Sequence, residues 1–113
     1  MSSKTIVKAI PMVSFDLSTI VLFPNFTPIN PDGLPEACFM LRIINDSAAV
    51  PHLNFSKQEI SQDFMHRNLG LNFYARNRSG KNVNFPKGTV VSIKTPPVQG
   101  LIHLVGYYTV LNR

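Results

Sequence analysis

The chain has 113 residues, which fits one domain and leaves little room for two, so we expect a single domain over residues 1–113. Charged residues make up 15% of the sequence, below the roughly 25% of an average soluble protein, and such a composition is common where neighbours cover a domain. No run approaches the roughly 18 apolar residues of a membrane span, the N-terminus leads into no apolar run of a signal peptide, and the single Cys38 excludes an intramolecular disulfide.

The first β-rich stretch ends near residue 22 and falls into two pieces. Residues 5–13 are rich in β-forming side chains, but they include Pro11, which cannot donate a hydrogen bond to a neighbouring strand. We therefore expect a break or a sheet edge at Pro11. A second strand is predicted over residues 15–22.

A proline-rich segment follows over residues 24–36. Its prolines are spaced three and four residues apart, which excludes a helix and a central strand, because each proline lacks the backbone N–H. The segment is predicted to form a stiff, extended arm that ends in a turn at residues 31–33. Phe23, Phe26 and Ile29 recur every three residues, as on one face of a polyproline II helix. We expect that face to pack either on the domain's own sheet or on a neighbouring subunit.

The clearest core strand covers residues 38–45. Phe39, Leu41 and Ile43 occupy alternate positions, a period of two that is typical of a strand with one face on the core. Asparagine, aspartate and serine then follow one another, and these residue types favour turns. A turn is therefore predicted at residues 45–47.

Further strands alternate with connections rich in proline, glycine and asparagine. Residues 50–55 are predicted as a short strand, and residues from 56 onward as one or two helical turns or a long loop. Strands are also predicted over residues 69–75 and 89–94. A long strand with two apolar faces is predicted over residues 101–111, and it should be central in a sheet or covered on both sides. The pattern predicts an all-β protein, an antiparallel β-sandwich or barrel-like fold with a proline-rich extended arm.

Positive charge is concentrated in the second half of the chain. The net charge is +5, residues 1–63 hold all six acidic side chains, and residues 64–113 hold none. In the basic segment, the aromatic side chains of Tyr74 and Phe85 interleave with cations. Such a segment can be a solvated loop, contact an acidic protein neighbour, or bind single-stranded nucleic acid by stacking bases and tracking phosphates. The cations in question are Arg76, Arg78, Lys81 and Lys87.

No pattern of residues predicts a catalytic, cofactor or metal site. His52, His66 and His103 are far apart in sequence and lack the spacing of metal ligands. Glu59 and Asp63 are four residues apart, but a single local pair of carboxylates is usually a solvated face. No glycine-rich phosphate loop follows a predicted strand. We therefore expect a protein that is not an enzyme and that has no cofactor and no small-molecule substrate.

Three segments resemble small virion structural proteins of tailed bacteriophages. They are Leu-Arg-Ile-Ile-Asn-Asp-Ser at residues 41–47, Lys-Gly-Thr-Val-Val-Ser-Ile-Lys at 87–94 and Gly-Leu-Ile-His-Leu-Val-Gly-Tyr-Tyr at 100–108. In those proteins a strand that ends in Ile-Asn-Asn/Asp-Ser is similarly followed by a Lys-Gly-Thr strand and by a Gly-x-Ile/Val-x-Leu-x-Gly-Tyr-Tyr strand. The three segments together cover under a third of the chain.

The resemblance implies a β-sandwich that acts by assembly in the neck, collar, tail or capsid accessories of a virion made in the bacterial host cytoplasm. Its expected partners are further copies of the chain and other virion proteins, with no membrane partner. The proline-rich arm and both termini are expected to supply subunit contacts. The alternative is a small basic β-barrel that binds single-stranded nucleic acid, whereas a sugar-binding β-sandwich would need an aromatic platform that the sequence does not offer. The expected interface residues are Phe23, Phe26, Ile29, Arg76, Arg78, Lys81 and Lys87.

Overall fold

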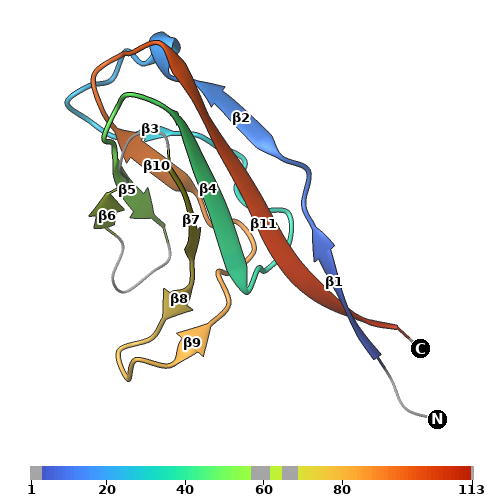
Figure 1. Cartoon of the computed structure of the whole chain (residues 1–113). Coiled ribbons are helices and arrows are strands. Elements are labelled where there is room, and N and C mark those ends of the chain that lie inside the picture. Colours follow the sequence, from blue (N-terminus) through green and yellow to red (C-terminus); the bar gives the residue numbers. More distant parts are fainter. Residues whose placement is uncertain (1–3, 57–61, 65–68, 113) are drawn as a thin grey trace.

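The long strand predicted near the C-terminus lies at the centre of the fold (Figure 1). The structure is a computed structural model, and it describes residues 4–56, 62–64 and 69–112. The elements, in chain order, are β1 (Lys4–Ala9), β2 (Val13–Asp16), the 3-10 helix η1 (Leu17–Thr19), β3 (Thr27–Pro28), β4 (Met40–Ser47), β5 (His52–Phe55), β6 (Gln62–Phe64), β7 (Leu69–Phe73), β8 (Ala75–Arg76), β9 (Asn82–Val83), β10 (Val91–Lys94) and β11 (Gly100–Asn112). The predicted all-β fold class is confirmed.

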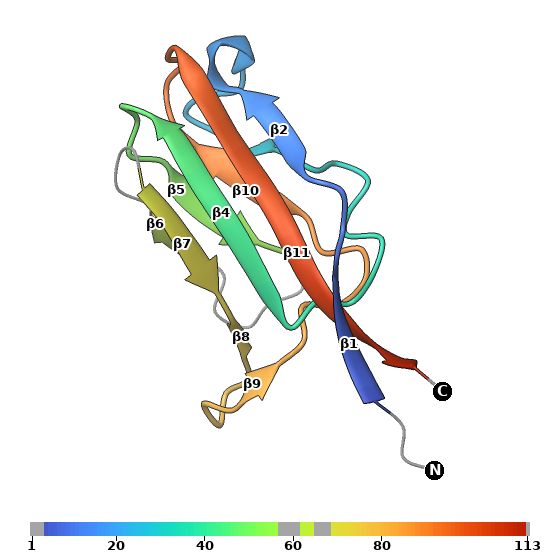
Figure 2. The ribbon, with the colours of Figure 1, turned by 45° about the vertical axis from the view of Figure 1, so that its right-hand side comes forward.

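Two antiparallel sheets form the sandwich (Figure 2). The first sheet has the strand order β1-β11-β4-β7, and β2 pairs with β11 as well. The second sheet has the order β3-β10-β5-β6 and packs behind the first, while β8 and β9 form a small separate hairpin. Each sheet therefore buries one face against the other and leaves its second face outside.

Strand β11 alternates between the core and the outside of the first sheet. Ile102 and Leu104 are fully buried, whereas Leu101 is exposed and His103 is half-buried. The strand pairs with β1 and β2 along one edge and with β4 along the other, which confirms its predicted central position. The surface of the first sheet that points away from the core is called the outer face below.

Aliphatic and aromatic side chains fill the space between the sheets. Leu41 of the first sheet and Val91 of the second are fully buried and belong to one hydrophobic cluster. Phe55 of β5 joins the two layers, because its ring centroid lies 5.4 Å from that of Phe73 and 5.5 Å from that of Phe85. The alternation of apolar residues along the strands therefore creates a continuous core.

The proline-rich segment lies along the second sheet. Its short strand β3 lies at the edge of that sheet and pairs only with β10 among the described strands. An edge position is expected because a proline has no backbone N–H to donate to a second neighbouring strand. Ile29 is buried in the core, and the Asn30 side chain accepts a hydrogen bond from the N–H of Val91 at 2.7 Å and donates one to the carbonyl of Thr89 at 3.1 Å. The predicted turn is confirmed, because the N–H of Gly33 donates to the carbonyl of Asn30 at 2.8 Å.

The turn predicted at residues 45–47 is wrong, because β4 continues to Ser47. Asn45 is buried, and its amide nitrogen donates to the carbonyl of Ala49 at 2.8 Å. Its amide oxygen accepts from the Ser47 hydroxyl at 2.6 Å. These bonds satisfy the polar groups that would otherwise oppose burial of an asparagine in a strand.

One further prediction fails at its end. The strand predicted over residues 15–22 stops at Asp16, whose carboxylate accepts from the N–H and the hydroxyl of Ser18 at 2.9 and 2.7 Å and so caps η1. The one or two helical turns or the long loop predicted from residue 56 onward fall mostly on residues 57–61, which lie outside the described part of the chain, and Gln62–Phe64 after them is strand β6. Within that described part, no helix is long and apolar enough to cross a bilayer.

Candidate assembly surfaces

A two-stranded ribbon leaves the body of the sandwich at the chain termini (Figures 1 and 2). In this terminal ribbon, Lys4–Ala9 of β1 pair with residues 107–112 of β11, from Lys4 opposite Asn112 to Ala9 opposite Tyr107. The pairing of β11 with β4 ends at Tyr107, so the described residues provide no third strand beyond that point. The interruption predicted at Pro11 is confirmed, because β1 ends before it and β2 begins after it.

The terminal ribbon exposes apolar side chains on both of its faces. All six residues of β1 are exposed, and the exposed fraction reaches 58% for Val7 and 61% for Leu111. Ile6 precedes Val7, so its side chain points to the opposite face of the ribbon. An isolated two-stranded ribbon is marginally stable in water, and contact with another surface would remove this apolar area from solvent.

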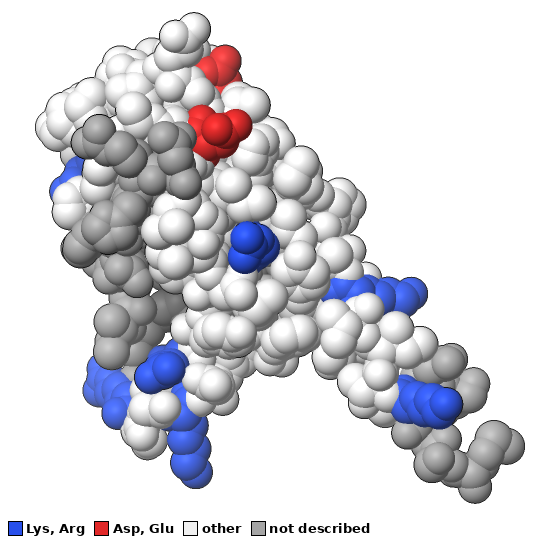
Figure 3. Space-filling model, in the orientation of Figure 1, with Lys and Arg blue, Asp and Glu red and all other residues white. Residues whose placement is uncertain are grey.

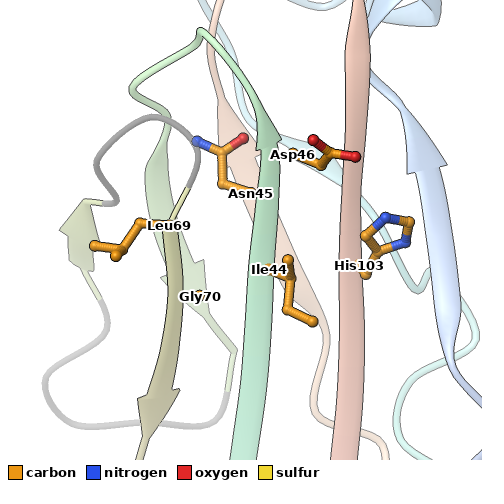
Figure 4. A pocket seen from close by; sticks show the side chains of 6 residues that line it. All are labelled: Ile44, Asn45, Asp46, Leu69, Gly70 and His103. Carbon is orange, nitrogen blue, oxygen red and sulfur yellow. The ribbon is translucent and has the colours of Figure 1, made fainter.

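The outer face of the first sheet contains a hollow of about 180 Å³ (Figure 4). Gly70 of β7 lies opposite Ile44 of β4, and the missing side chain at Gly70 leaves space between neighbouring strands. The hollow is therefore lined by both apolar and polar residues. The residues that line it are Ile44, Asn45, Asp46, Leu69, Gly70 and His103.

A serine and a histidine meet beside this hollow. The Ser14 hydroxyl on β2 lies 2.7 Å from Nδ1 of His103 on β11, a contact that also occurs between a catalytic serine and its base. A catalytic site further needs a group that orients the histidine and donors for an oxyanion. The nearby Asp16 carboxylate instead accepts hydrogen bonds from Ser18, which lower its pKa below the usual value. Among the described residues, His103 makes no second side-chain hydrogen bond. The Ser14–His103 pair therefore provides only one of the contacts that a catalytic site needs.

Other groups capable of chemistry are buried or dispersed. Burial raises the pKa of the Cys38 thiol above its usual value, and the Glu36 carboxylate raises it further, so the thiol stays protonated at neutral pH. Cys38 therefore packs in the core as a small apolar side chain. Among the described residues, no group of three or more His, Cys, Asp or Glu side chains is placed to hold a metal ion.

The predicted basic segment forms the β8–β9 hairpin and the loops around it. Arg76, Arg78, Lys81 and Lys87 are all exposed, as the sequence analysis expected of contact residues. The Asn77 carboxamide organises the loop by accepting from the N–H groups of Ser79 and Lys81 at 3.0 and 3.1 Å. On the face shown in Figure 3, basic side chains gather over this hairpin and on the terminal ribbon, and acidic ones lie at the opposite end.

The two aromatic residues of the basic segment differ in accessibility. Phe85 is buried in the core and exchanges backbone hydrogen bonds with Cys38 at 2.9 and 2.7 Å. Tyr74 is 49% exposed. Base stacking on this hairpin would therefore depend on Tyr74, since the Phe85 ring has no free face.

The aromatic and aliphatic residues expected on one face of the proline-rich segment point to different surroundings. Ile29 packs in the core of its own chain, and Phe26 is half-buried with the Lys94 ammonium 5.2 Å from its ring centroid. Phe23 is exposed. Phe23 is thus the member of this group whose ring is most accessible to a neighbour.

Contacts at both termini are expected from the sequence, whereas the apolar side chains that the termini expose become visible only in the structure. The available signal was the pair of adjacent apolar residues Ile6 and Val7, which cannot both face a core from one strand.

Comparison of the chain with protein-family models, curated proteins and solved structures gives no match.

Proposed function

We propose that this protein is a non-enzymatic structural component of a tailed-phage virion, in a neck, collar, tail or capsid-accessory position, and that it acts by binding further copies of itself and other virion proteins. The resemblance of residues 41–47, 87–94 and 100–108 to such proteins supports the setting. The exposed apolar terminal ribbon supports the mode of action and is the observation that carries the proposal.

The physical basis of assembly would be the transfer of ribbon side chains from water into a contact. Full burial of a valine or leucine side chain contributes about 1.5–3 kcal/mol, and Val7 and Leu111 have more than half of that area still exposed. Among the described strands β1 is an edge strand, and its outer backbone edge can pair with a further strand. Both contributions require a partner surface.

We expect Val7→Asp to impair incorporation of the protein into particles while its melting temperature changes little. The side chain is exposed in the isolated chain, so a charge there is harmless until a partner must cover it. The measurement is the amount of variant that co-sediments with intact particles. Val21→Asp is the control, because Val21 is 86% exposed and lies outside the ribbon. Normal incorporation of Val7→Asp, or equal loss in both variants, would count against the ribbon.

The exposed cations of the β8–β9 hairpin favour a second candidate function, the binding of single-stranded nucleic acid. Arg76, Arg78, Lys81 and Lys87 would then neutralise phosphates while Tyr74 stacks on a base. Contact with acidic side chains of a neighbouring subunit uses the same cations at short range. The two alternatives differ in their response to salt.

If about four phosphates of a single strand are neutralised, a plot of the logarithm of the binding constant against the logarithm of the salt concentration has a slope near −3. The affinity for the strand would then fall about fifty-fold between 50 and 200 mM salt. We expect the purified protein to bind oligonucleotides no more tightly than a peptide of equal charge, and Arg76→Glu with Arg78→Glu to reduce incorporation into particles. The measurements are fluorescence anisotropy at several salt concentrations and co-sedimentation. Tight oligonucleotide binding that these two changes abolish, with incorporation intact, would make nucleic acid the primary partner.

A further inference from the structure

The terminal ribbon is basic, and the end of the outer face that holds Asp16 and Asp46 is acidic. Lys4 and Lys8 are exposed on β1, and the described residues of the ribbon include no acidic side chain. On the outer face, Asp16 of β2 and Asp46 of β4 both lie opposite Leu101 of β11, one on either side of it, and both are exposed. A basic apolar ribbon and an acidic apolar surface thus occur in one molecule.

The acidic part of the outer face also provides space for a side chain. Asp46 lines the hollow together with Ile44 and His103, and Leu101 beside it is exposed. Arg42 is a cation of the same face whose guanidinium end lies beside Gly70 and donates to the Asn72 carboxamide at 3.0 Å, so the negative charge lies on the Asp46 side of the hollow. An apolar side chain with a lysine nearby would therefore find both a cavity and a carboxylate at this place.

A chain cannot place its own ribbon in its own hollow. The hollow lies beside His103, and Leu111 lies eight residues further along the same continuous strand β11. At ~3.3 Å per residue, these two positions are separated by about 26 Å along an extended strand. A ribbon that fills the hollow must come from another molecule.

We propose that the terminal ribbon of one copy binds the hollow and the adjacent acidic rim on the outer face of a second copy, with Lys8 near Asp46 and an apolar ribbon side chain in the hollow. This inference rests on the proposed assembly function and names its partner. The contact joins two different surfaces, so copies associate head to tail and form a closed ring or a filament.

The experiment compares the self-association of purified variants by analytical ultracentrifugation at low salt. Lys8→Glu and Asp46→Lys are each expected to weaken the association of the wild-type chain at least about tenfold, which corresponds to about 1.4 kcal/mol. The double variant Lys8→Glu with Asp46→Lys restores the charge pair and should recover most of the association. Asp32→Lys is the control for the new lysine, because Asp32 is exposed in the turn before Gly33, outside the outer face.

Mixing the two single variants tests the head-to-tail geometry. The Lys8→Glu chain keeps a native outer face and the Asp46→Lys chain keeps a native ribbon, so an equimolar mixture should associate more tightly than either variant alone. Gly70→Val is an uncharged test of the hollow. A Cβ at residue 70 would lie 3.0 Å from the mobile end of Arg42 and 3.5 Å from Ile44, so the variant should fold and yet associate about tenfold more weakly.

The outcomes separate this inference from the proposed function. If Lys8→Glu weakens association but Asp46→Lys and Gly70→Val do not, the ribbon binds another surface and the inference is wrong. If the wild-type chain stays monomeric while Val7→Asp still abolishes incorporation into particles, the ribbon's partner is a different virion protein. In that case the head-to-tail contact is rejected and the assembly function stands. Recovery in both the double variant and the mixture supports the contact.

Discussion

Replacement of Gly33 by alanine is expected to lower the free energy of unfolding by about 2–5 kcal/mol. Gly33 has a φ of +80°, which costs a residue with a side chain about 1–2 kcal/mol. A Cβ at this position would also lie 2.6 Å from the carbonyl oxygen of Gly88 and 2.7 Å from its Cα. Both are backbone atoms, so the loop must shift, at an overpacking cost of about 1–3 kcal/mol.

Gly80→Ala is a matched control for this substitution. Gly80 has a φ of +81°, almost the same as that of Gly33, but a Cβ there would meet no atom within 4 Å. Chemical denaturation of the two variants should therefore show a loss of only about 1–2 kcal/mol for Gly80→Ala, and the difference between them measures the crowding at Gly88. Equal losses would mean that the two loops do not approach each other as closely as described.

The contact at Gly33 matters because it holds the proline-rich segment on the sandwich. The N–H of Gly88 donates to the carbonyl of Leu34 at 2.8 Å, and the N–H of Leu34 donates to the carbonyl of Thr89 at 3.0 Å. Gly33 and Gly88 thus allow two loops to pair by their backbones where side chains would keep them apart. The segment that the sequence predicts as an extended arm is ordered by these bonds and by the burial of Ile29.

Strand positions could be predicted where burial follows the period of the backbone. Leu41 and Ile43 alternate with half-buried neighbours, and Ile102 and Leu104 do the same in β11, so both strands were identified from their patterns. The prediction failed at Asn45, because a turn-forming residue type became a strand residue once Ala49 and Ser47 satisfied its amide. Such bonds depend on how the chain closes on itself, which a local pattern does not contain.

The candidate surfaces were harder to predict than the strands. The cations from Arg76 to Lys87 were visible in the sequence because charge clusters there without acids. The terminal ribbon requires the pairing of Lys4 with Asn112, near the two ends of the chain, and the hollow requires Gly70 opposite Ile44. Local periodicity predicts a strand but does not say which strand lies beside it or where a sheet ends.

Phe85→Ala is the second substitution with a large expected effect, a loss of about 3–5 kcal/mol in the free energy of unfolding. The Phe85 ring is 2% exposed and its centroid lies 5.5 Å from that of Phe55, so its removal leaves a cavity between the two sheets. Thermal denaturation should show a drop of about 10 °C or more. Tyr74→Ala is the control from the same basic segment, and its half-exposed ring should make it nearly neutral for stability.

Substitutions at Tyr74 and Phe85 also separate the two candidate functions of the basic hairpin. If single-stranded nucleic acid were the partner, Tyr74→Ala would weaken binding, because base–aromatic stacking contributes about 1–3 kcal/mol per base. Phe85→Leu, which keeps most of the core volume, would leave that binding unchanged. A folded Phe85→Ala protein with an unaltered melting temperature would show that the ring is not in the core. Phe85 would then be free to stack on a base beside Tyr74, which would favour single-stranded nucleic acid as the partner of the basic hairpin.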